Sequence, residues 1–270
     1  MPGIRFLFWN VNRQPLDERV GRIVTSRQVD VVLLAEAGTA ADVLAGRLER
    51  STASRFIAAD GANGQFAVCI RLPRRSFRLT LDAPRWRVYR VVVDQIPEFL
   101  LTVAHLPSKL HTDEHTQAVA VDELVADVAR YEARRGHFRT ALVGDLNMNP
   151  FEPGGSGARG LHGVNSATVA ARETREVRGT EFRMFYNPMW GLRGDRSPGP
   201  SGTFYRGAAD AVNYFWNTYD QVLLRPELAP RLSELEILAT DGVESLLTPN
   251  GRPDDVNASD HLPLLFRLEW

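Results

Sequence analysis

Cysteine and lysine are almost absent from this chain of 270 residues, and each absence excludes a class of site. Cys69 is the only cysteine, so an intramolecular disulfide and a zinc site built from several cysteines are impossible. It lies in the apolar run FAVCI, which indicates a buried and unreactive thiol. Because a chain so poor in cysteine suits a reducing compartment, we expect a cytoplasmic protein. Lys109 is the only lysine and stands outside any G-x-x-x-x-G-K-[ST] motif, which excludes a Walker-type phosphate loop.

Long apolar runs and a strong net charge are also missing. No window reaches the roughly 20 apolar residues of a membrane-spanning helix, and the apolar stretch in MPGIRFLFWN is too short for a signal peptide. We therefore expect no membrane segment. The formal net charge is −1, so no overall basic field indicates nucleic acid. With 44% hydrophobic residues, the chain can bury a sizeable core.

What the sequence does contain is a series of short apolar runs that predict buried strands. The runs are IRFLFW, VDVVLLA, FAVCIRL, WRVYRVVV, FLLTVA, RTALV, DQVLL and LPLLFRL. Two helices are predicted between them. Residues 16–28 place three apolar side chains on one face, and residues 112–135 begin with acidic residues, carry an apolar stripe and end in arginines before a glycine.

Strands interleaved with helices, without an internal repeat or a long linker, predict one domain over residues 1–270. Because strand and helix do not alternate regularly, we expect an α/β domain with mixed sheets. Glycine and proline are concentrated at residues 153–160 and 191–202, and this density predicts two irregular surface loops.

Polar residues of a few types recur at the ends of the predicted strands. They are Asn10, Glu36, His105, Asp145, Asn147, Ser259, Asp260 and His261. Any one of them can be an ordinary polar residue where a strand reaches solvent. Together, however, they offer oxygen ligands for a hard cation and two imidazoles for proton transfer or charge stabilisation.

The segments FWNVN, LLAE, VAHLPSK, GDLNMNP, YDQVLL and SDHLPL follow one another in this order along nearly the whole chain. In this combination the chain resembles the endonuclease/exonuclease/phosphatase superfamily, which includes deoxyribonuclease I, exonuclease III-type abasic endonucleases, neutral sphingomyelinases and inositol-polyphosphate 5-phosphatases. GDLN and SDHLP are the most specific segments. The resemblance implies a four-layer α/β sandwich, in which two packed mixed β-sheets are flanked by helices and the site lies at one edge.

The resemblance also implies a metal site around Glu36, which corresponds to the family's strand-terminal glutamate. Asn10 corresponds to the asparagine near the metal, and Asn12 stands where many members have an aspartate. Because this replacement removes one negative charge, we expect weaker metal affinity or a metal shifted toward Glu36. Mg²⁺ binds through one or two carboxylates and keeps several waters. It is the expected cofactor, with Mn²⁺ as an alternative.

The same resemblance implies roles in phosphodiester hydrolysis. Asp145 corresponds to the aspartate that orients or deprotonates the attacking water, and Asn147 to its partner at the phosphate. His261 is the candidate general base or charge stabiliser, with Asp220 of YDQVLL as its orienting carboxylate. Whether Asp145 or His261 accepts the proton of the water stays open.

Asp260 and His105 complete the implied catalytic set. Asp260 is expected close to the metal or the phosphate. His105 is expected to contact the scissile phosphate, as in the deoxyribonuclease and sphingomyelinase branches, whereas the abasic-endonuclease branch typically has tyrosine there. The other histidines are predicted to be solvated, because no second metal motif accompanies them. They are His111, His115, His137 and His162.

Candidate substrate contacts come first from residues 71–90, which hold seven arginines and one aspartate. Arginines can bind phosphates and aromatic rings can stack on bases. The candidates in this segment are Arg71, Arg74, Arg75, Phe77, Trp86 and Tyr89. The alternative, which we favour, is a pair of amphipathic strands whose charged outer faces are solvated.

A second candidate surface combines the aromatic segment at residues 184–190 with Arg193, Arg196 and Arg206. The alternative is a loop that packs its own aromatic residues over the core. Loops near the site select the substrate in the family, so Arg193 and Arg206 are retained as candidate substrate contacts.

These expectations favour a Mg²⁺-dependent phosphodiesterase that acts on nucleic acid, with DNA as the favoured substrate. A phosphoesterase for small molecules or lipid headgroups is the alternative, because the near-neutral net charge leaves it open, although no amphipathic membrane helix supports it. A third interpretation is an inactive family member that serves as a binding module. Asn12 suggests it, but an inactive site is not expected to keep Glu36, Asp145 and His261 together. The sequence does not give the oligomeric state.

Overall fold

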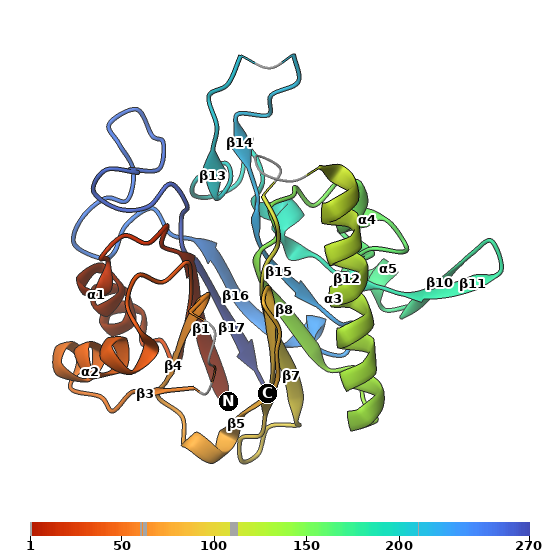
Figure 1. Cartoon of the computed structure of the whole chain (residues 1–270), viewed down its shortest axis with the longest axis horizontal. Coiled ribbons are helices and arrows are strands. Elements are labelled where there is room, and N and C mark those ends of the chain that lie inside the picture. Colours follow the sequence, from red (N-terminus) through yellow and green to blue (C-terminus); the bar gives the residue numbers. More distant parts are fainter. Residues whose placement is uncertain (1, 60, 62–63, 109–112, 210) are drawn as a thin grey trace.

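The computed structural model describes residues 2–59, 61, 64–108, 113–209 and 211–270. Two large β-sheets pack face to face in the centre of the molecule, and helices cover both outer faces (Figure 1). This arrangement is the four-layer α/β sandwich implied by the resemblance, so the predicted fold class is confirmed.

The first sheet has six strands in the order β16-β17-β1-β2-β4-β3. They are β1 (Gly3–Asn10), β2 (Val31–Ala35), β3 (Ile57–Ala58), β4 (Phe66–Ile70), β16 (Leu232–Ile237) and β17 (Leu264–Glu269). β1 runs parallel to β2 and antiparallel to β17, and β2 runs antiparallel to β4. The sheet is therefore mixed, as predicted.

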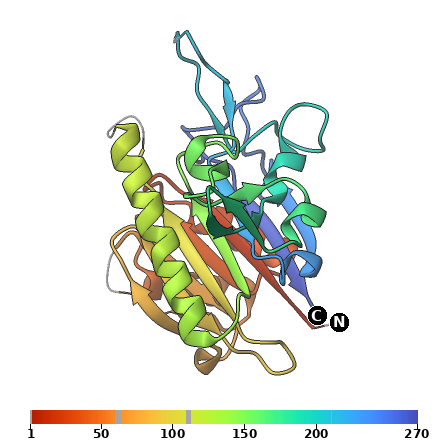
Figure 2. The ribbon, with the colours of Figure 1, turned by 90° about the vertical axis from the view of Figure 1, so that its right-hand side faces the viewer.

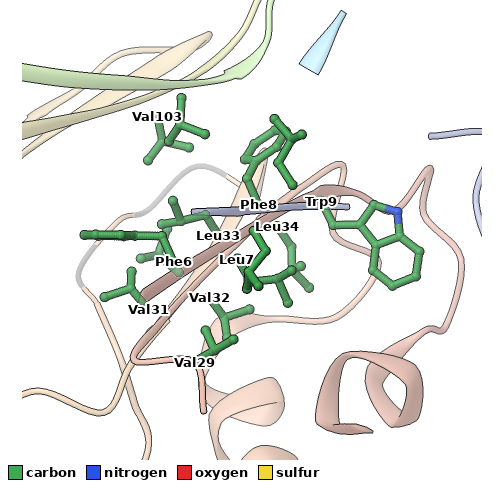
Figure 3. Close-up of a cluster of buried hydrophobic side chains, with 14 of the residues drawn as sticks. Phe6, Leu7, Phe8, Trp9, Val29, Val31, Val32, Leu33, Leu34 and Val103 are labelled. Carbon is green, nitrogen blue, oxygen red and sulfur yellow. The ribbon is translucent and has the colours of Figure 1, made fainter. Parts of the chain in front are cut away.

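Both faces of this sheet are buried, which explains why β1 and β2 are continuous apolar runs rather than alternating ones. Phe6, Phe8 and Leu33 point toward the second sheet, where Val103 lies, whereas Leu7 points to the opposite side (Figure 3). The core between the sheets thus depends on alternate residues of each strand, and the other residues pack under the helices.

Two helices cover the outer face of the first sheet (Figure 1). They are α1 (Asp17–Arg27) and α2 (Ala41–Thr52). α1 confirms the helix predicted over residues 16–28. α2 was not predicted from the sequence, because only three of its 12 residues are buried and so short an apolar stripe gives a weak periodic signal.

The second sheet has seven strands in the order β5-β6-β7-β8-β15-β12-β9. They are β5 (Phe77–Asp82), β6 (Trp86–Val91), β7 (Phe99–His105), β8 (Thr140–Asp145), β9 (Gly163–Val164), β12 (Phe185–Tyr186) and β15 (Asp220–Leu224). β7 and β8 are parallel, and β15 is antiparallel to β8. Every apolar run predicted as a strand forms one in the first or second sheet.

A single long helix, α3 (Glu114–Arg135), lies across the outer face of the second sheet (Figure 2). Val121 of this helix is buried in one cluster with Leu142 of β8. The side chain of Asp113 accepts a hydrogen bond at the helix N-terminus, and Gly136 ends the helix in the left-handed conformation. The structure thus confirms the predicted helix over its described part.

Short elements fill the connections. They are α4 (Pro153–Ser156), α5 (Ala167–Ala170), the 3₁₀ turns η1 (Arg74–Ser76), η2 (Pro188–Leu192) and η3 (Ala229–Arg231), and two ribbons formed by β10 (Thr174–Val177) with β11 (Thr180–Arg183) and by β13 (Phe204–Tyr205) with β14 (Trp216–Asn217). The loop predicted at residues 153–160 therefore begins with one helical turn. The β13–β14 ribbon projects beyond the ends of β1 and β8 (Figure 1).

The topology gathers the predicted polar strand ends at one end of the molecule. The parallel pair β1 and β2 ends there, with Asn10 opposite Ala35. In the second sheet, His105 of β7 lies opposite Asp145 of β8, which in turn lies opposite Asp220 of β15. The two chain termini lie at the other end of the sheets (Figure 1), so this edge is left to side chains from both sheets.

Two further expectations concern the core and the membrane. Cys69 is fully buried in β4, and burial raises the pKa of its thiol to about 12, which confirms the expected unreactive side chain. Among the described residues, the structure contains no helix that is both long enough and apolar enough to span a bilayer.

Candidate active site

Asn10 links the two sheets at the edge where the strand ends meet. Its Nδ2 atom donates a hydrogen bond to Oδ2 of Asp145 at 2.9 Å and faces Oε1 of Glu36 at 3.5 Å. Its Oδ1 atom accepts the backbone N–H of Asn12 at 3.0 Å, which fixes the orientation of the amide. A neutral donor therefore holds Glu36 and Asp145 on one side of the pocket without neutralising either.

The backbone at three of these strand ends is in the left-handed region. The φ angle is 45° at Asn12, 47° at Glu36 and 50° at Asn147, which is unfavourable for residues other than glycine. Oδ1 of Asp145 accepts the N–H of Asn147 at 2.9 Å and stabilises one of these turns. Gly144 precedes that turn, and a Cβ there would collide with a carbonyl oxygen of β7, so the GDLN segment requires its glycine.

A buried pair, Asp220 and His261, stands beside Asp145. Nδ1 of His261 lies 2.8 Å from Oδ2 of Asp220, and its Nε2 lies 3.8 Å from Oδ2 of Asp145. The backbone N–H of His261 donates to the hydroxyl of Ser259 at 3.2 Å, and its ring packs against Phe204 with centroids 4.8 Å apart. The imidazole is thus fixed with one nitrogen on Asp220 and the other directed toward Asp145.

The carboxylates around His261 decide its charge. Burial alone would lower its pKa, but Asp220 and Asp145 oppose this effect and raise the pKa to about 10. Burial also raises the pKa of Asp220, against the charge of His261. The surrounding carboxylates therefore favour the protonated imidazole, whose Nε2 would then be a donor directed toward Asp145 and the pocket.

His105 supplies a second imidazole. Its Nε2 atom lies 3.6 Å from Oε1 of Glu36 and 3.7 Å from Oδ2 of Asp145. Its Nδ1 atom is in hydrogen-bond contact with the side-chain amide of Gln65. Gln65 also accepts the backbone N–H of Glu36 through its backbone carbonyl oxygen at 3.0 Å. No sequence pattern indicates Gln65, because its role depends on the fold of the connection before β4.

These side chains line one pocket of about 270 Å³. The lining residues are Asn10, Asn12, Glu36, His105, Ser108, Asp145, Asn147, Phe204, Arg206, Tyr219, Asp260 and His261. Nine of the 12 were candidate site residues from the sequence. Asp220 does not line the pocket because it is fully buried behind His261. Ser108, Phe204 and Tyr219 were not selected from the sequence, since hydroxyl and aromatic side chains in loops give no motif of their own.

The pocket is chemically suited to a divalent cation. The carboxylate of Glu36 is partly exposed, and its nearest contacts are longer than ordinary hydrogen bonds. Asp145, Asp220 and His261 offer ligand atoms within 4.8 Å of one another, although the last two already bind each other. Asp260 adds a third carboxylate to the lining. Oxygen ligands with room for water are the surroundings that Mg²⁺ or Mn²⁺ requires.

Asn10 differs from the expected ligand in one respect. Its amide nitrogen, rather than its oxygen, faces the carboxylates of Glu36 and Asp145. In this orientation Asn10 presents an amide donor to the two carboxylates, and its oxygen is bound to the backbone N–H of Asn12. Asn12 is exposed at the rim of the pocket, where the family's aspartate would have placed a further charge.

A family model covers this whole arrangement. The model of the endonuclease/exonuclease/phosphatase family matches residues 7–261. The chain belongs to this family. Its enzymes act on phosphoester bonds and depend on metal ions, and a hydrolase of this class is what the pocket's carboxylates and imidazoles support.

Solved structures of the endonuclease/exonuclease/phosphatase family share the fold at low sequence identity. Truncated TDP2 of Caenorhabditis elegans has a TM-score of 0.57 at 13% identity, over 99% of this chain and 98% of that chain. D. rerio TDP2, complexed with a single-strand DNA product, has a TM-score of 0.57 at 13% identity over 100% of both chains. ANGEL2, a 2′,3′-cyclic phosphatase, has a TM-score of 0.59 at 16% identity, over 99% and 96%. A comparison with curated proteins gives no significant match.

Three of the arginines proposed as substrate contacts lie at the opposite end of the sheets from the pocket. Arg71 follows β4, whose last residue pairs with the first residue of β2, and it is ion-paired with Asp30 at 2.7 Å. Arg74 and Arg75 form η1 at the same end. The structure therefore does not bring these arginines to the pocket that contains Glu36, and their contact with a substrate stays a prediction. The solvated alternative describes them better.

The aromatic residues of that segment also fail as stacking platforms, because all three are buried in the core. They are Phe77, Trp86 and Tyr89. In the second candidate surface, Arg206 lines the pocket. Arg193 does not line it, because it donates to Oδ1 of Asn149 at 2.8 Å and lies over the ring of Phe151. The prediction of substrate contact is therefore retained for Arg206 and not for Arg193.

Two histidines predicted to be solvated are buried. His137 packs behind α3, where its Nε2 lies 3.4 Å from Glu98, and His162 is only 1% exposed. Burial lowers the pKa of both imidazoles. His115 is exposed, as predicted, and His111 lies outside the described residues. Neither buried histidine lines the pocket, so they belong to the scaffold.

Proposed function

We propose that this chain is a Mg²⁺-dependent phosphodiesterase that cleaves nucleic acid, with DNA as the favoured substrate. The observation that supports it is the convergence of Glu36, Asp145, Asp260 and His261 in one pocket, with Asp220 bound to His261 behind it. The proposal treats residues 1–270 as one domain. It also keeps a cytoplasmic location, which the single buried Cys69 favours.

Glu36 is the proposed principal metal ligand, with Asp145 or Asp260 beside it. A bound cation neutralises charge on the phosphate oxygens and lowers the pKa of bound water. Asn10 donates to Asp145 and faces Glu36, so it holds the ligands in place. Asn12 at the rim predicts weaker cation affinity than an aspartate there would give.

The charge of His261 favours a division of labour between it and Asp145. Because the imidazole is protonated at neutral pH, His261 stabilises negative charge on the phosphate and does not accept a proton. The carboxylate of Asp145, which Asn10 and the N–H of Asn147 orient, then orients the attacking water and accepts its proton. His105, whose Nε2 also faces Oδ2 of Asp145, donates to a phosphate oxygen.

Two features support nucleic acid as the substrate. Phe204 of the β13–β14 ribbon and the adjacent Arg206 line the pocket. Tyr214 and Phe215, directly before β14, are each 51% accessible. Exposed aromatic rings beside a phosphate site can stack on unpaired bases. D. rerio TDP2, which shares the fold, was solved with a single-strand DNA product.

A small-molecule or lipid-headgroup phosphoesterase is the second candidate. The enclosed volume of about 270 Å³ is large enough for a small phosphorylated molecule, and the net charge of −1 gives no general attraction to DNA. An inactive binding module is disfavoured, because the Asp220–His261 pair and Glu36 are all in place.

One panel separates these candidates. The protein is incubated with supercoiled plasmid, an abasic-site oligonucleotide, and phosphorylated lipids and inositols, each with Mg²⁺, Mn²⁺ or a chelator. Plasmid nicking that requires metal and disappears in His261→Ala, but persists in Arg75→Ala, is the expected result. Turnover of lipids or inositols alone would assign the second candidate, and tight binding without turnover of any substrate would assign the binding module.

A further inference from the structure

The pocket around Glu36 continues into a second cleft. This cleft encloses about 480 Å³ and shares Glu36, His105 and Ser108 with the catalytic pocket. The rest of its lining is formed by Arg13, by Arg85 and by the segments that follow β2 and precede β4. Because the two cavities share these residues, a substrate bound at His105 can extend from the first cavity into the second.

The two cavities carry opposite charge. The catalytic pocket is lined by three carboxylates and one arginine. In the second cleft, among the residues that the structure describes, Glu36 is the only carboxylate, and Arg13 and Arg85 carry positive charge. A site for a cation is thus adjacent to a site for an anion, which is the arrangement that two successive groups of one substrate would require.

The backbone of Arg85 is held next to His105. It lies in the turn between β5 and β6, and its carbonyl oxygen accepts the backbone N–H of His105 at 2.8 Å. Its side chain is exposed and forms no ion pair with any residue of the described chain. The backbone is therefore fixed next to His105, and the exposed guanidinium belongs to the lining of the second cleft.

Arg13 is held beside Glu36 in the lining of the same cleft. Its backbone N–H donates to the carbonyl oxygen of Glu36 at 2.9 Å, and a Cβ at Gly38 would lie 2.8 Å from the carbonyl oxygen of Arg13. The glycine thus permits the two segments to touch. The Arg13 side chain is 83% exposed, and its Nε lies 3.8 Å from Glu36, too far for a hydrogen bond.

We propose that Arg13 and Arg85 bind the phosphate next to the scissile phosphate of a nucleic acid strand. The proposal rests on the proposed function and names the substrate feature that the second cleft recognises. Guanidinium groups bind phosphate oxygens through paired charge-assisted hydrogen bonds. A Cβ at Gly64 would meet no atom within 4 Å, so the cleft is open at this part of its lining.

The test uses oligonucleotides with one cleavable phosphodiester and one neutral methylphosphonate, placed on its 5′ or its 3′ side. For the wild-type protein, the methylphosphonate on one side is expected to raise KM about tenfold, as the loss of one charge-assisted contact does. Arg85→Ala and Arg13→Ala are expected to raise KM for the unmodified strand by a similar factor. In these variants the methylphosphonate then adds less than about twofold, because the contact is already lost. Arg75→Ala is the matched control and keeps the wild-type response.

The possible outcomes distinguish the subsite from the nuclease itself. If the KM effects of Arg85→Ala and of the methylphosphonate multiply, whether the methylphosphonate is on the 5′ or the 3′ side, Arg85 does not contact that phosphate. This result would refute the subsite but not the nuclease activity. If the wild type cleaves bis(4-nitrophenyl) phosphate but no oligonucleotide, the proposed substrate is wrong, and the assignment of the cleft to a nucleic acid phosphate is wrong with it. A preference for inositol polyphosphates that depends on Arg85 would refute the same assignment. Thermal unfolding of each variant checks that it is folded.

Discussion

The two ends of β15 carry two buried acid–base pairs with different consequences. At the start of the strand, Asp220 binds His261 at 2.8 Å beside the pocket. Just after its end, Arg225 binds Glu132 of α3 at 2.8 Å, and Glu132 also accepts the hydroxyl of Thr140 at 2.7 Å. Both pairs exclude water, but only one of them contains a group that can release a proton.

The difference separates stability from chemistry. Both carboxylate oxygens of Glu132 are hydrogen-bonded by Arg225, whose guanidinium stays charged at any ordinary pH and also lies over the ring of Phe185. His261 instead presents Nε2 to Asp145 and the pocket. The Glu132–Arg225 pair, whose carboxylate oxygens are both hydrogen-bonded, holds α3 to the sheet. The Asp220–His261 pair leaves Nε2 of His261 directed toward the pocket, where a substrate can reach it.

The largest effect is expected at the open pair. His261→Ala should lower phosphodiester hydrolysis by about 10²- to 10³-fold, the usual loss when one donor that stabilises transition-state charge is removed. Asp220→Asn should lower it within the same range, because the imidazole loses its orientation and its charge. Hydrolysis rates measured on folded protein check this. A loss smaller than about threefold in both variants would remove the pair from the mechanism.

The closed pair should show the reverse behaviour. Glu132→Ala leaves Arg225 buried without a partner and should reduce the free energy of unfolding by about 3–5 kcal/mol. Urea unfolding gives the stability, and activity per folded molecule should stay near the wild-type value. An inactive but fully stable Glu132→Ala protein would reverse the assignment of the two pairs.

The buried histidines sharpen the comparison through pH. The pKa of His162 is lowered in the folded chain, so the stability that the neutral ring provides is lost as the pH falls below the unfolded value of about 6.5. The pKa of His261 is raised to about 10, so its contribution is complete below that unfolded value and is lost as the pH rises toward 10. As the pH falls to about 5.5, the wild type should therefore lose unfolding free energy relative to His162→Gln. The difference in unfolding free energy between wild type and His261→Gln should shrink between about pH 7 and pH 10.

The smallest effects are expected at the end of the sheets opposite the pocket. Arg74→Ala and Arg75→Ala should change cleavage and DNA affinity by less than about twofold, because solvated charges distant from a ligand are screened. DNA affinity measured at several salt concentrations is the control, since each lost phosphate contact reduces the salt dependence. A weaker salt dependence of DNA affinity in Arg75→Ala would indicate that this end of the molecule does contact DNA.

Most of the polar residues that line the pocket could be predicted from the sequence, because they lie at or next to the ends of apolar runs. Asp145 follows RTALVG, and parallel neighbours such as β7 and β8 must end at the same edge, so His105 and Asp145 meet there. Asp220 could be proposed only from the resemblance, since the segment YDQVLL alone does not indicate that this carboxylate pairs with His261. Periodicity sufficed for the strands because both faces of the sheets are buried.

The sequence could not show which arginines lie near the pocket. The alternation of apolar and polar residues predicts the face of a strand on which a side chain lies, but not the end of the sheet that it reaches. Arg75 and Arg85 belong to one segment, but the six residues of β5 span about 20 Å. The chain reverses at Arg85, so this residue reaches His105 while Arg75 lies at the other end. Gln65, like Arg85, acts from a connection whose course depends on tertiary packing. The burial of His137 and His162 likewise depends on packing partners that no local pattern reveals.

The rate of plasmid nicking as a function of Mg²⁺ concentration, measured for wild type and Glu36→Gln, tests the central claim most directly. A saturable dependence is expected for the wild type. In Glu36→Gln, which keeps the shape of the side chain, the midpoint should rise by at least about 10- to 100-fold, while Arg75→Ala should follow the wild-type curve. Identical curves for wild type and Glu36→Gln, or nicking that persists in chelator, would contradict a metal-dependent phosphodiesterase site at this edge of the sheets.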